Sequence, residues 1–179
     1  RAYIDAFANF IGPDTDIPAP DMYTDQRCMG WMYDEYRLIK GGHPKDVITG
    51  KPAALGGLDG RTSATGHGGY YVLETLINNY RHTLNIDNKL DDITIAIQGF
   101  GKVGYWLAKK GHDSGLKVVA LSNEFGATYK ASGLDVEKCR QSLNDTNEKD
   151  WGDGEKINNE KLIELKVDVF APSAVEDVL

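Results

Sequence analysis

The residues whose types and spacing could do chemistry lie in the segment GFGKVG, residues 99–104. Its three glycines follow the GxGxxG pattern, with Phe100, Lys102 and Val103 between them. In a dinucleotide cradle, Gly99 permits a tight turn, Gly101 lets the backbone approach a pyrophosphate, and Gly104 allows close packing of helix on sheet. Backbone N–H groups at the start of the following helix then stabilise the phosphate charge. The alternative is a glycine-rich turn that merely packs.

A second group of polar residues follows the next apolar run of the chain. Dinucleotide-binding folds often carry an acidic residue there, which holds the ribose hydroxyls. The run ends Ser122-Asn123-Glu124, and Asn123 lies 123 − 104 = 19 positions after Gly104. An amide can bond a ribose hydroxyl without repelling a 2′-phosphate, and Glu124 is adjacent. The pattern therefore leaves NAD and NADP both open. Lys102 could reach a phosphate or be a solvated lysine.

The elements that must position these residues read as a parallel α/β sheet. Apolar, β-branched runs predict strands at 93–97, 117–122 and 167–171. Helical spacing predicts helices at 102–112 and 158–165. Alternation of strand and helix is typical of parallel sheets. The context that GxGxxG requires, a strand before and a helix after, is therefore met.

Outside these strands and helices, the sequence predicts three further helices and several loops. Helices are expected over 1–11, 24–40 and 70–84, with Gly41-Gly42 ending the second. Prolines fix residues 17–21 as an extended segment that ends on Asp21. Glycines punctuate residues 43–69, which predicts a loop. Residues 124–133 read as a turn-rich excursion and 144–156 as a surface loop.

Bulk properties exclude several classes of function. A net charge of −7 argues against nucleic acid or an anionic membrane as partner, and no apolar run approaches the length of a membrane span. Cys28 and Cys139 form no disulfide framework, and the four scattered histidines suggest no metal site. We therefore expect a cytoplasmic protein with reduced thiols and no metal.

Longer motifs resemble a known family. The segments IGPDTDIPAPD (11–21), ITGKPAALGGLDGRTSATGHG (48–68), IAIQGFGKVG (95–104) and KVVALSNEFGATYKASGLD (117–135) look like consecutive signatures of the glutamate/leucine/phenylalanine/valine dehydrogenases. Their order and spacing match across nearly the whole chain, including VDVFAPSAVEDV (167–178), and they fit the glutamate-specific branch best. Several motifs in register are far more specific than GxGxxG alone.

The resemblance implies a fold and an activity. The expected fold is a Rossmann-type, doubly wound parallel sheet preceded by the tail of a separate substrate domain. Residues 1–45 would be that tail and 46–179 the NAD(P)-binding domain, incomplete at its C-terminus. Family members oxidatively deaminate an amino acid, and the resemblance implies L-glutamate, converted to 2-oxoglutarate and ammonia, with hydride passing to NAD or NADP. Their usual homo-hexamer is expected of the full-length parent.

The resemblance also implies roles for individual residues. Asp21, in PAPD, matches the carboxylate that shuttles protons at the substrate nitrogen. On sequence physics alone a cap of the helix that follows would be favoured, and the motif reverses that preference. Thr65, in ATG, matches the threonine that bonds the nicotinamide carboxamide. Lys102 replaces a common Asn, and Leu58 a common Ser, which weakens a polar role for Leu58. Arg61 matches a family position that could instead serve loop structure.

The family's catalytic lysine motif is not found in these residues, and Lys51, in TGKP, does not match it. We therefore expect a fragment that is inactive by itself, derived from an active NAD(P)-dependent parent enzyme. Two alternatives remain at this stage. The chain could act as a non-catalytic nucleotide-binding module, or the parent could be a leucine, phenylalanine or valine dehydrogenase.

Overall fold

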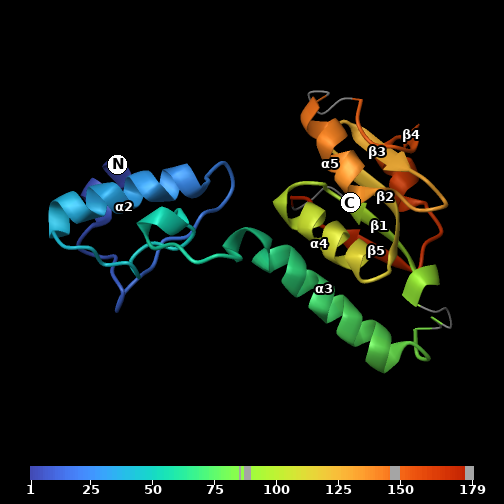
Figure 1. The fold of residues 1–179 in the computed structure, drawn as a ribbon, viewed down its shortest axis with the longest axis horizontal. Coiled ribbons are helices and arrows are strands. Elements are labelled where there is room, and N and C mark those ends of the chain that lie inside the picture. Colours follow the sequence, from blue (N-terminus) through green and yellow to red (C-terminus); the bar gives the residue numbers. More distant parts are fainter. Residues whose placement is uncertain (85, 87–89, 146–149, 176–179) are drawn as a thin grey trace. The chain divides into compact units, whose positions relative to one another are not determined.

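The computed structural model describes residues 1–84, 86, 90–145 and 150–175 (Figure 1). The chain divides into two units, Arg1–Thr62 (unit 1) and Ser63–Leu179 (unit 2). Unit 1 contains α1 (Ala2–Phe7), α2 (Gln26–Lys40) and the short 3-10 helix η1 (Ala53–Leu55). Unit 2 contains a five-stranded sheet and its helices.

Unit 1 is built around one face of α2. The carboxylate of Asp25 accepts from the N–H groups of Arg27 and Cys28 and so caps the start of α2. Gly41, at φ 73°, ends the helix with a backbone bond to the carbonyl of Arg37, as the sequence predicts. The buried core joins α1, α2 and the loop after them, and consists of Ile4, Ala8, Ile11, Met29, Tyr33, Tyr36, Val47 and Ile48. This core fixes the segments on either side of α2.

Three parallel strands carry the centre of unit 2. β1 (Thr94–Gln98) lies between β2 (Lys117–Asn123) and β5 (Val169–Pro172), parallel to both. β3 (Gly126–Tyr129) and β4 (Glu155–Ile157) extend the sheet with antiparallel pairing, which gives the order β4-β3-β2-β1-β5. The mostly parallel α/β sheet confirms the predicted fold class.

Helices cover both faces of this sheet. Ile95 and Ile97 of β1 pack in the cluster that includes residues of α3 (Arg61–Tyr80), α4 (Lys102–Asp113) and α5 (Val136–Asp145). Ala96, between them, packs on the opposite face with Leu162 of α6 (Asn159–Ile163). Side chains alternate across a strand, so a strand buried on both faces is apolar throughout. Ile95, Ala96 and Ile97 of β1 are all apolar because both faces of the strand are buried.

The prediction of a loop up to Gly69 is wrong at its C-terminal end. α3 begins at Arg61, so Gly66, Gly68 and Gly69 lie inside a 20-residue helix. A Cβ built on Gly66 would lie 2.5 Å from the Cβ of Trp106 and 2.7 Å from the carbonyl oxygen of Val103. Gly66 is therefore needed for the close approach of α3 to α4, and its absent side chain is a packing requirement and not a sign of a turn.

The predicted excursion at 124–133 is also wrong, because it contains β3. The side-chain oxygen of Asn123 accepts from the N–H of Phe125 and so starts the turn between β2 and β3. Ala127 and Thr128 are buried in the sheet. The predicted surface loop at 144–156 likewise runs into β4 at Glu155, while residues 146–149 lie outside the described part of the chain.

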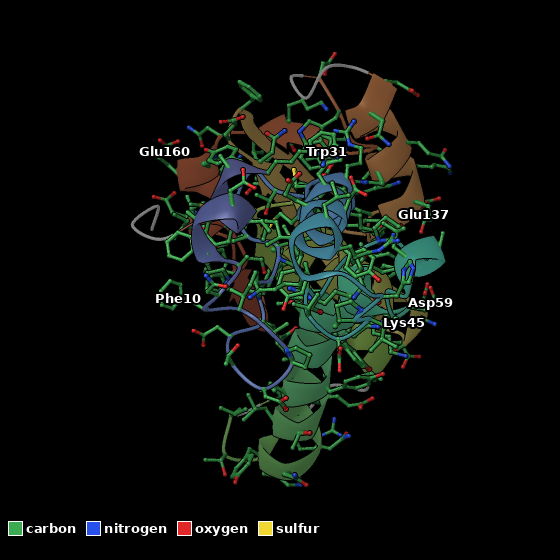
Figure 2. All side chains as sticks on the ribbon, turned by 90° about the vertical axis from the view of Figure 1, so that its left-hand side faces the viewer. Phe10, Trp31, Lys45, Asp59, Glu137 and Glu160 are labelled. Carbon is green, nitrogen blue, oxygen red and sulfur yellow. The ribbon has the colours of Figure 1, made fainter. Side chains whose placement is uncertain are left out.

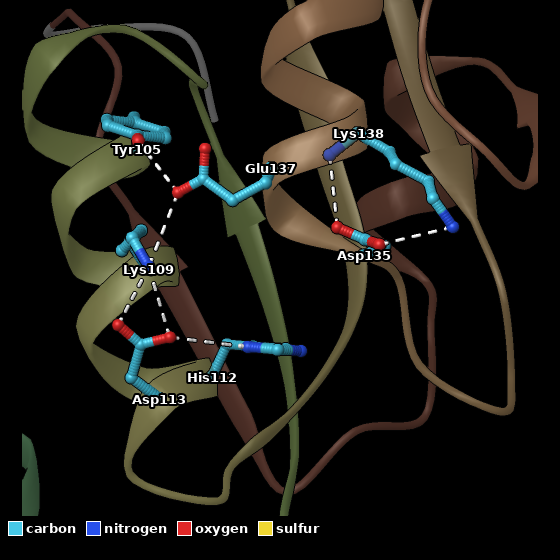
Figure 3. Close-up of polar contacts among 7 residues, drawn as sticks. All are labelled: Tyr105, Lys109, His112, Asp113, Asp135, Glu137 and Lys138. Carbon is cyan, nitrogen blue, oxygen red and sulfur yellow. Dashed lines mark hydrogen bonds and ion pairs between the residues drawn. The ribbon is translucent and has the colours of Figure 1, made fainter.

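Polar contacts join α4 to α5 on the surface of unit 2 (Figure 3). The ammonium of Lys109 lies 2.9 Å from Asp113 and 3.3 Å from Glu137. The hydroxyl of Tyr105 donates to the same Glu137 oxygen at 3.1 Å. These half-exposed pairs orient the two helices but contribute little free energy. The apolar packing beneath them fixes α4, and with it the glycine segment at its start.

Candidate dinucleotide site

Two glycines of the segment 99–104 are required by the fold itself. Gly99 has φ 90°, and a Cβ there would lie 2.8 Å from the backbone of Ser173 and Ala174, next to β5. A Cβ on Gly104 would lie 1.8 Å from the carbonyl oxygen of Gly99. Neither position admits a side chain. The turn from β1 into α4 therefore has the tight geometry that the sequence predicts.

Gly101 differs from both of them. A Cβ built on it meets no atom within 4 Å, and its φ of −76° is open to any residue. The fold therefore does not need a glycine here. A side chain would instead fill the space in front of the first turn of α4, where a pyrophosphate would approach the backbone. Since Gly101 is the N-cap and has no side chain, it cannot satisfy the amide groups of that turn.

Neighbouring strands hold this turn from two sides. The hydroxyl of Ser122, at the end of β2, accepts from the N–H of Gly99 at 3.2 Å. The N–H of Ser173, after β5, donates to the carbonyl of Gln98 at 2.7 Å. Sequence reasoning missed both serines. Ser122 is 1% exposed, and the available signal was a lone hydroxyl at the end of an otherwise apolar strand.

The side chain of Phe100 belongs to the core. Its ring stacks on Trp151 at 5.3 Å between centroids, with an angle of 8° between planes, and meets the edge of Tyr105. A contact of Phe100 with a dinucleotide would therefore come from its backbone. Lys102 and Val103, on the first turn of α4, are exposed. They lie where side chains can flank a ligand on the helix N-terminus.

The end of β2 also places Asn123 and Glu124 at the carboxyl edge of the sheet, where α/β proteins bind ligands. The Asn123 side-chain oxygen accepts from the Phe125 N–H, and its backbone carbonyl accepts from the amide of Asn159 at 3.0 Å. Asn123 is thus held in one orientation. Glu124 is exposed.

Thr65 lies on α3, one residue before the glycine that packs on α4. It is exposed, in the same unit as the cradle. The ring of His67 meets the edge of the Trp106 ring across the same contact between the two helices. The packing of α3 on α4 therefore brings Thr65 to the side of the first turns of α4.

Asp21 lies in unit 1, apart from these residues in the chain. Its N–H donates to the hydroxyl of Thr24 at 2.7 Å, and its carboxylate accepts from the N–H of Met22 at 2.8 Å. The side chain is exposed. The alternative that Asp21 caps the following helix is wrong, because Asp25 does so. The amide of Cys28 holds the pKa of Asp25 at about 2, while Asp21 has no part in starting α2.

Other kinds of site find no support in the part of the chain that the structure describes. Over those residues, no group of three or more His, Cys, Asp and Glu could hold a metal ion. Over the same residues, no helix has the length and apolar character to cross a membrane. Both cysteines are free thiols; burial raises the pKa of Cys139 to about 11.

Comparison with known proteins finds two family models. The model of the glutamate/leucine/phenylalanine/valine dehydrogenases matches residues 56–179, and that of the dimerisation domain of the same family matches residues 1–38. The NADP-specific glutamate dehydrogenase of Synechocystis is 37% identical over 99% of this chain. Glutamate dehydrogenase A2 of Halobacterium salinarum is 40% identical over the whole chain. The chain spans 42% of the length of each of these relatives.

Solved structures of glutamate dehydrogenases resemble this chain as well. A hetero-hexameric glutamate dehydrogenase from Thermus thermophilus, in a leucine-bound form, superposes with a TM-score of 0.87 at 33% identity, over 99% of this chain and 40% of that one. The glutamate dehydrogenase of Peptoniphilus asaccharolyticus gives 0.69 at 30% identity, over 98% and 40%. The likeness therefore extends over both units of the chain.

Proposed function

The chain belongs to the glutamate/leucine/phenylalanine/valine dehydrogenase family, and from this premise we propose that the protein carrying it oxidatively deaminates an amino acid with NAD or NADP. L-Glutamate is the proposed substrate, and 2-oxoglutarate and ammonia the products. The observation that carries the proposal is the open space at Gly101 beside crowded Gly99 and Gly104. A turn with a purely structural role needs glycine only where a Cβ would collide with neighbouring atoms. A bound dinucleotide also needs glycine at a position such as Gly101, where a side chain would occupy the space of the cofactor.

We propose that the cofactor lies on the carboxyl edge of the sheet of unit 2. Bound there, NAD or NADP supplies the acceptor or donor of hydride. Residues 99–104 would hold the pyrophosphate through the N–H groups after Gly99, whose own N–H donates to Ser122, with Lys102 and Val103 beside it and Phe100 contributing backbone. Asn123 and Glu124 would hold the ribose, and Thr65 the nicotinamide carboxamide, which sets the ring face turned to substrate.

Asn123 supports a cofactor with or without a 2′-phosphate. A carboxylate at the end of β2 would repel that phosphate, whereas an amide does not. The amide nitrogen of Asn123 is a hydrogen-bond donor, which suits an acceptor on the ribose. Glu124, the neighbouring carboxylate, favours the unphosphorylated ribose.

Asp21 is the proposed proton carrier. Making and hydrolysing an imine requires repeated proton transfers at the substrate nitrogen, and an exposed carboxylate can accept and return them. The turn at 21–24 supports this role, since it fixes the backbone of Asp21 and leaves the side chain exposed. Tyr23, at φ 60°, holds a strained conformation within that turn.

Domain division, assembly and location are further proposals. Residues 1–45 are assigned to the substrate domain and 46–179 to the nucleotide domain, with the matches at 1–38 and 56–179 in support. A homo-hexamer is proposed for the whole protein, with the cytoplasm as its compartment. The 179 residues by themselves are proposed to bind a nucleotide without turnover, because no lysine among them matches the family's catalytic motif.

A deamination assay tests the activity. The protein carrying this chain is offered L-glutamate, L-leucine, L-phenylalanine or L-valine, each with NAD and with NADP, and reduced nicotinamide is followed by absorbance. Glutamate should give the highest kcat/KM. Asp21→Asn should lower kcat by about 10²- to 10⁴-fold, while Asp14→Asn, an exposed control in the same unit, should not. Oxidation of none of the four would overturn the function; full kcat in Asp21→Asn would remove Asp21 from the chemistry.

A further inference from the structure

Lys51 carries a buried charge that the proposed reaction does not use. The residue is 4% exposed. Its Nζ donates to the carbonyl of Lys45 at 2.5 Å and to that of Ile48 at 2.7 Å, and lies 5.5 Å from the centre of the Tyr33 ring. Burial lowers the pKa of Lys51, and nearby Asp46 opposes this.

Burying an ammonium is costly unless its protons are satisfied. Here both acceptors are backbone carbonyls of the preceding turn, so the side chain folds back under its own loop. Removal of the donors would leave these carbonyls without the bonds to Lys51 and release the turn. Lys51 therefore holds residues 45–51 (the lysine loop) in one conformation.

The lysine loop in turn holds the proline segment that precedes Asp21. The N–H of Thr49 donates to the carbonyl of Pro18 at 3.0 Å. Gly50, at φ 73°, lies against Pro20 so closely that a Cβ would be 2.7 Å from the Cγ of that proline. Pro20 is bonded directly to Asp21. A movement of the lysine loop is therefore transmitted to the backbone of Asp21 through one hydrogen bond and one close contact.

We propose that Lys51 is a positioning residue for Asp21, because it holds the loop that fixes Pro18 and Pro20. The connection between Lys51 and Asp21 consists of contacts within unit 1 alone. Its consequence for catalysis rests on the proposed function, in which Asp21 carries protons. A 1 Å misplacement of such a group costs about 10²-fold in rate.

The first test reads the link without activity, in the 179-residue chain. Hydrogen exchange of the Thr49 amide and the NMR shift of the Asp21 carboxyl carbon are compared in wild type, Lys51→Met and Lys45→Met. The control changes an exposed side chain in the same loop and keeps the backbone carbonyl that accepts from Lys51. Lys51→Met should exchange Thr49 at least about 10-fold faster and shift Asp21, while the amides of α2 exchange as before. Unchanged Thr49 and Asp21 signals would overturn the proposal.

A second pair of variants covers the case in which Lys51→Met does not fold. Gly50→Ala drives a methyl group into Pro20, whereas Gly42→Ala places one at φ 72° with no atom within 4 Å. The two carry similar backbone strain and only the first disturbs the prolines. Gly50→Ala should shift the Asp21 signal and Gly42→Ala should not. Equal signals in both would contradict the link.

The kinetic test uses the protein that carries the chain. Lys51→Met should lower kcat by about 10- to 100-fold at nearly unchanged KM and alter the pH profile of kcat, and Lys51→Arg should restore part of the rate. A loss that merely follows the fraction of folded protein, with the wild-type pH profile, would overturn the positioning role. If wild type itself deaminates nothing, the proposed function fails, and the exchange result still decides whether Lys51 holds Asp21.

Discussion

At the residue scale, the three glycines of residues 99–104 differ in whether the surrounding atoms leave room for a side chain. Gly99 and Gly104 are crowded, whereas Gly101 borders open space. The sequence predicts all three through their spacing, because GxGxxG between a strand and a helix has a specific geometry. It could not predict that Ser122 holds the turn, because that contact joins segments distant in the chain. Nor could it predict that Lys51 is buried, because the acceptors of Lys51 are backbone carbonyls, which no residue pattern reveals.

Substitutions at Gly104 and Gly101 should differ in how much they destabilise the fold. Gly104→Ala should destabilise unit 2 by at least about 2 kcal/mol, because its methyl group would collide with the carbonyl of Gly99. Gly101→Ala should cost less than about 1 kcal/mol, because alanine is a poorer N-cap than glycine but meets no neighbouring atom. Urea denaturation followed by circular dichroism measures both. Equal destabilisation would mean that the turn is not built as described.

The two aspartates of residues 21–25 should separate function from folding. Asp25→Ala removes the cap of α2 and should lower the melting temperature, whereas Asp21→Asn should leave it unchanged. Because the folded pKa of Asp25 is depressed from 3.8 to about 2, its contribution to stability is present above pH 4. That contribution is lost as pH falls toward 2. The difference in melting temperature between wild type and Asp25→Ala should therefore shrink over this acid range, and a constant difference would contradict the cap.

At the element scale, the strongly apolar strand β1 could be predicted from the sequence, whereas the short strands β3 and β4 and the glycine-rich start of α3 could not. The apolar run of β1 predicts a strand, because a strand that is buried on both faces of a sheet consists mainly of apolar residues. β3 and β4, three to four residues long, carry too little periodicity to be seen. The start of α3 was missed because Gly66, Gly68 and Gly69 resemble a loop until the close packing of α4 is known. Phe10, which follows the end of α1, and Trp31 of α2 are both exposed (Figure 2), so an apolar residue in or beside a helix is not always buried.

The burial of α5 predicts an alkaline loss of stability in unit 2. Burial raises the pKa of Cys139 from 9.0 to about 11, so the folded state retains a proton that the unfolded state releases. The contribution of this group is full below pH 9 and is lost as pH rises through 11. The hydroxyls of Tyr70 and Tyr105, whose pKa values burial also raises, act in the same direction.

Urea denaturation between pH 8 and about 11 measures this effect. The free energy of unfolding should fall with pH, and less steeply in Cys139→Ala. In wild type at neutral pH, an alkylating reagent should modify half-buried Cys28 before Cys139. Equal rates for the two thiols would show that α5 is not packed as described.

At the scale of the whole molecule, the chain has two units, and models of one family match residues 1–38 and 56–179. The sequence identified this family through several motifs in register, each too long to recur by chance. It could not choose between NAD and NADP, because the choice depends on how Asn123 and Glu124 are oriented at the end of β2. The chain spans 42% of its curated relatives, so turnover is a property proposed for the whole protein, whereas nucleotide binding is proposed for this chain.

The most direct test of the dinucleotide site is calorimetric titration of the chain with NADH and with NADPH, in wild type and in Gly101→Val. We predict that wild type binds at least one of them, and that Gly101→Val remains folded but binds at least about 10-fold more weakly, or about 1.4 kcal/mol. Binding of neither nucleotide by wild type, or undiminished binding by a folded Gly101→Val, would contradict the assignment of residues 99–104 as the dinucleotide site.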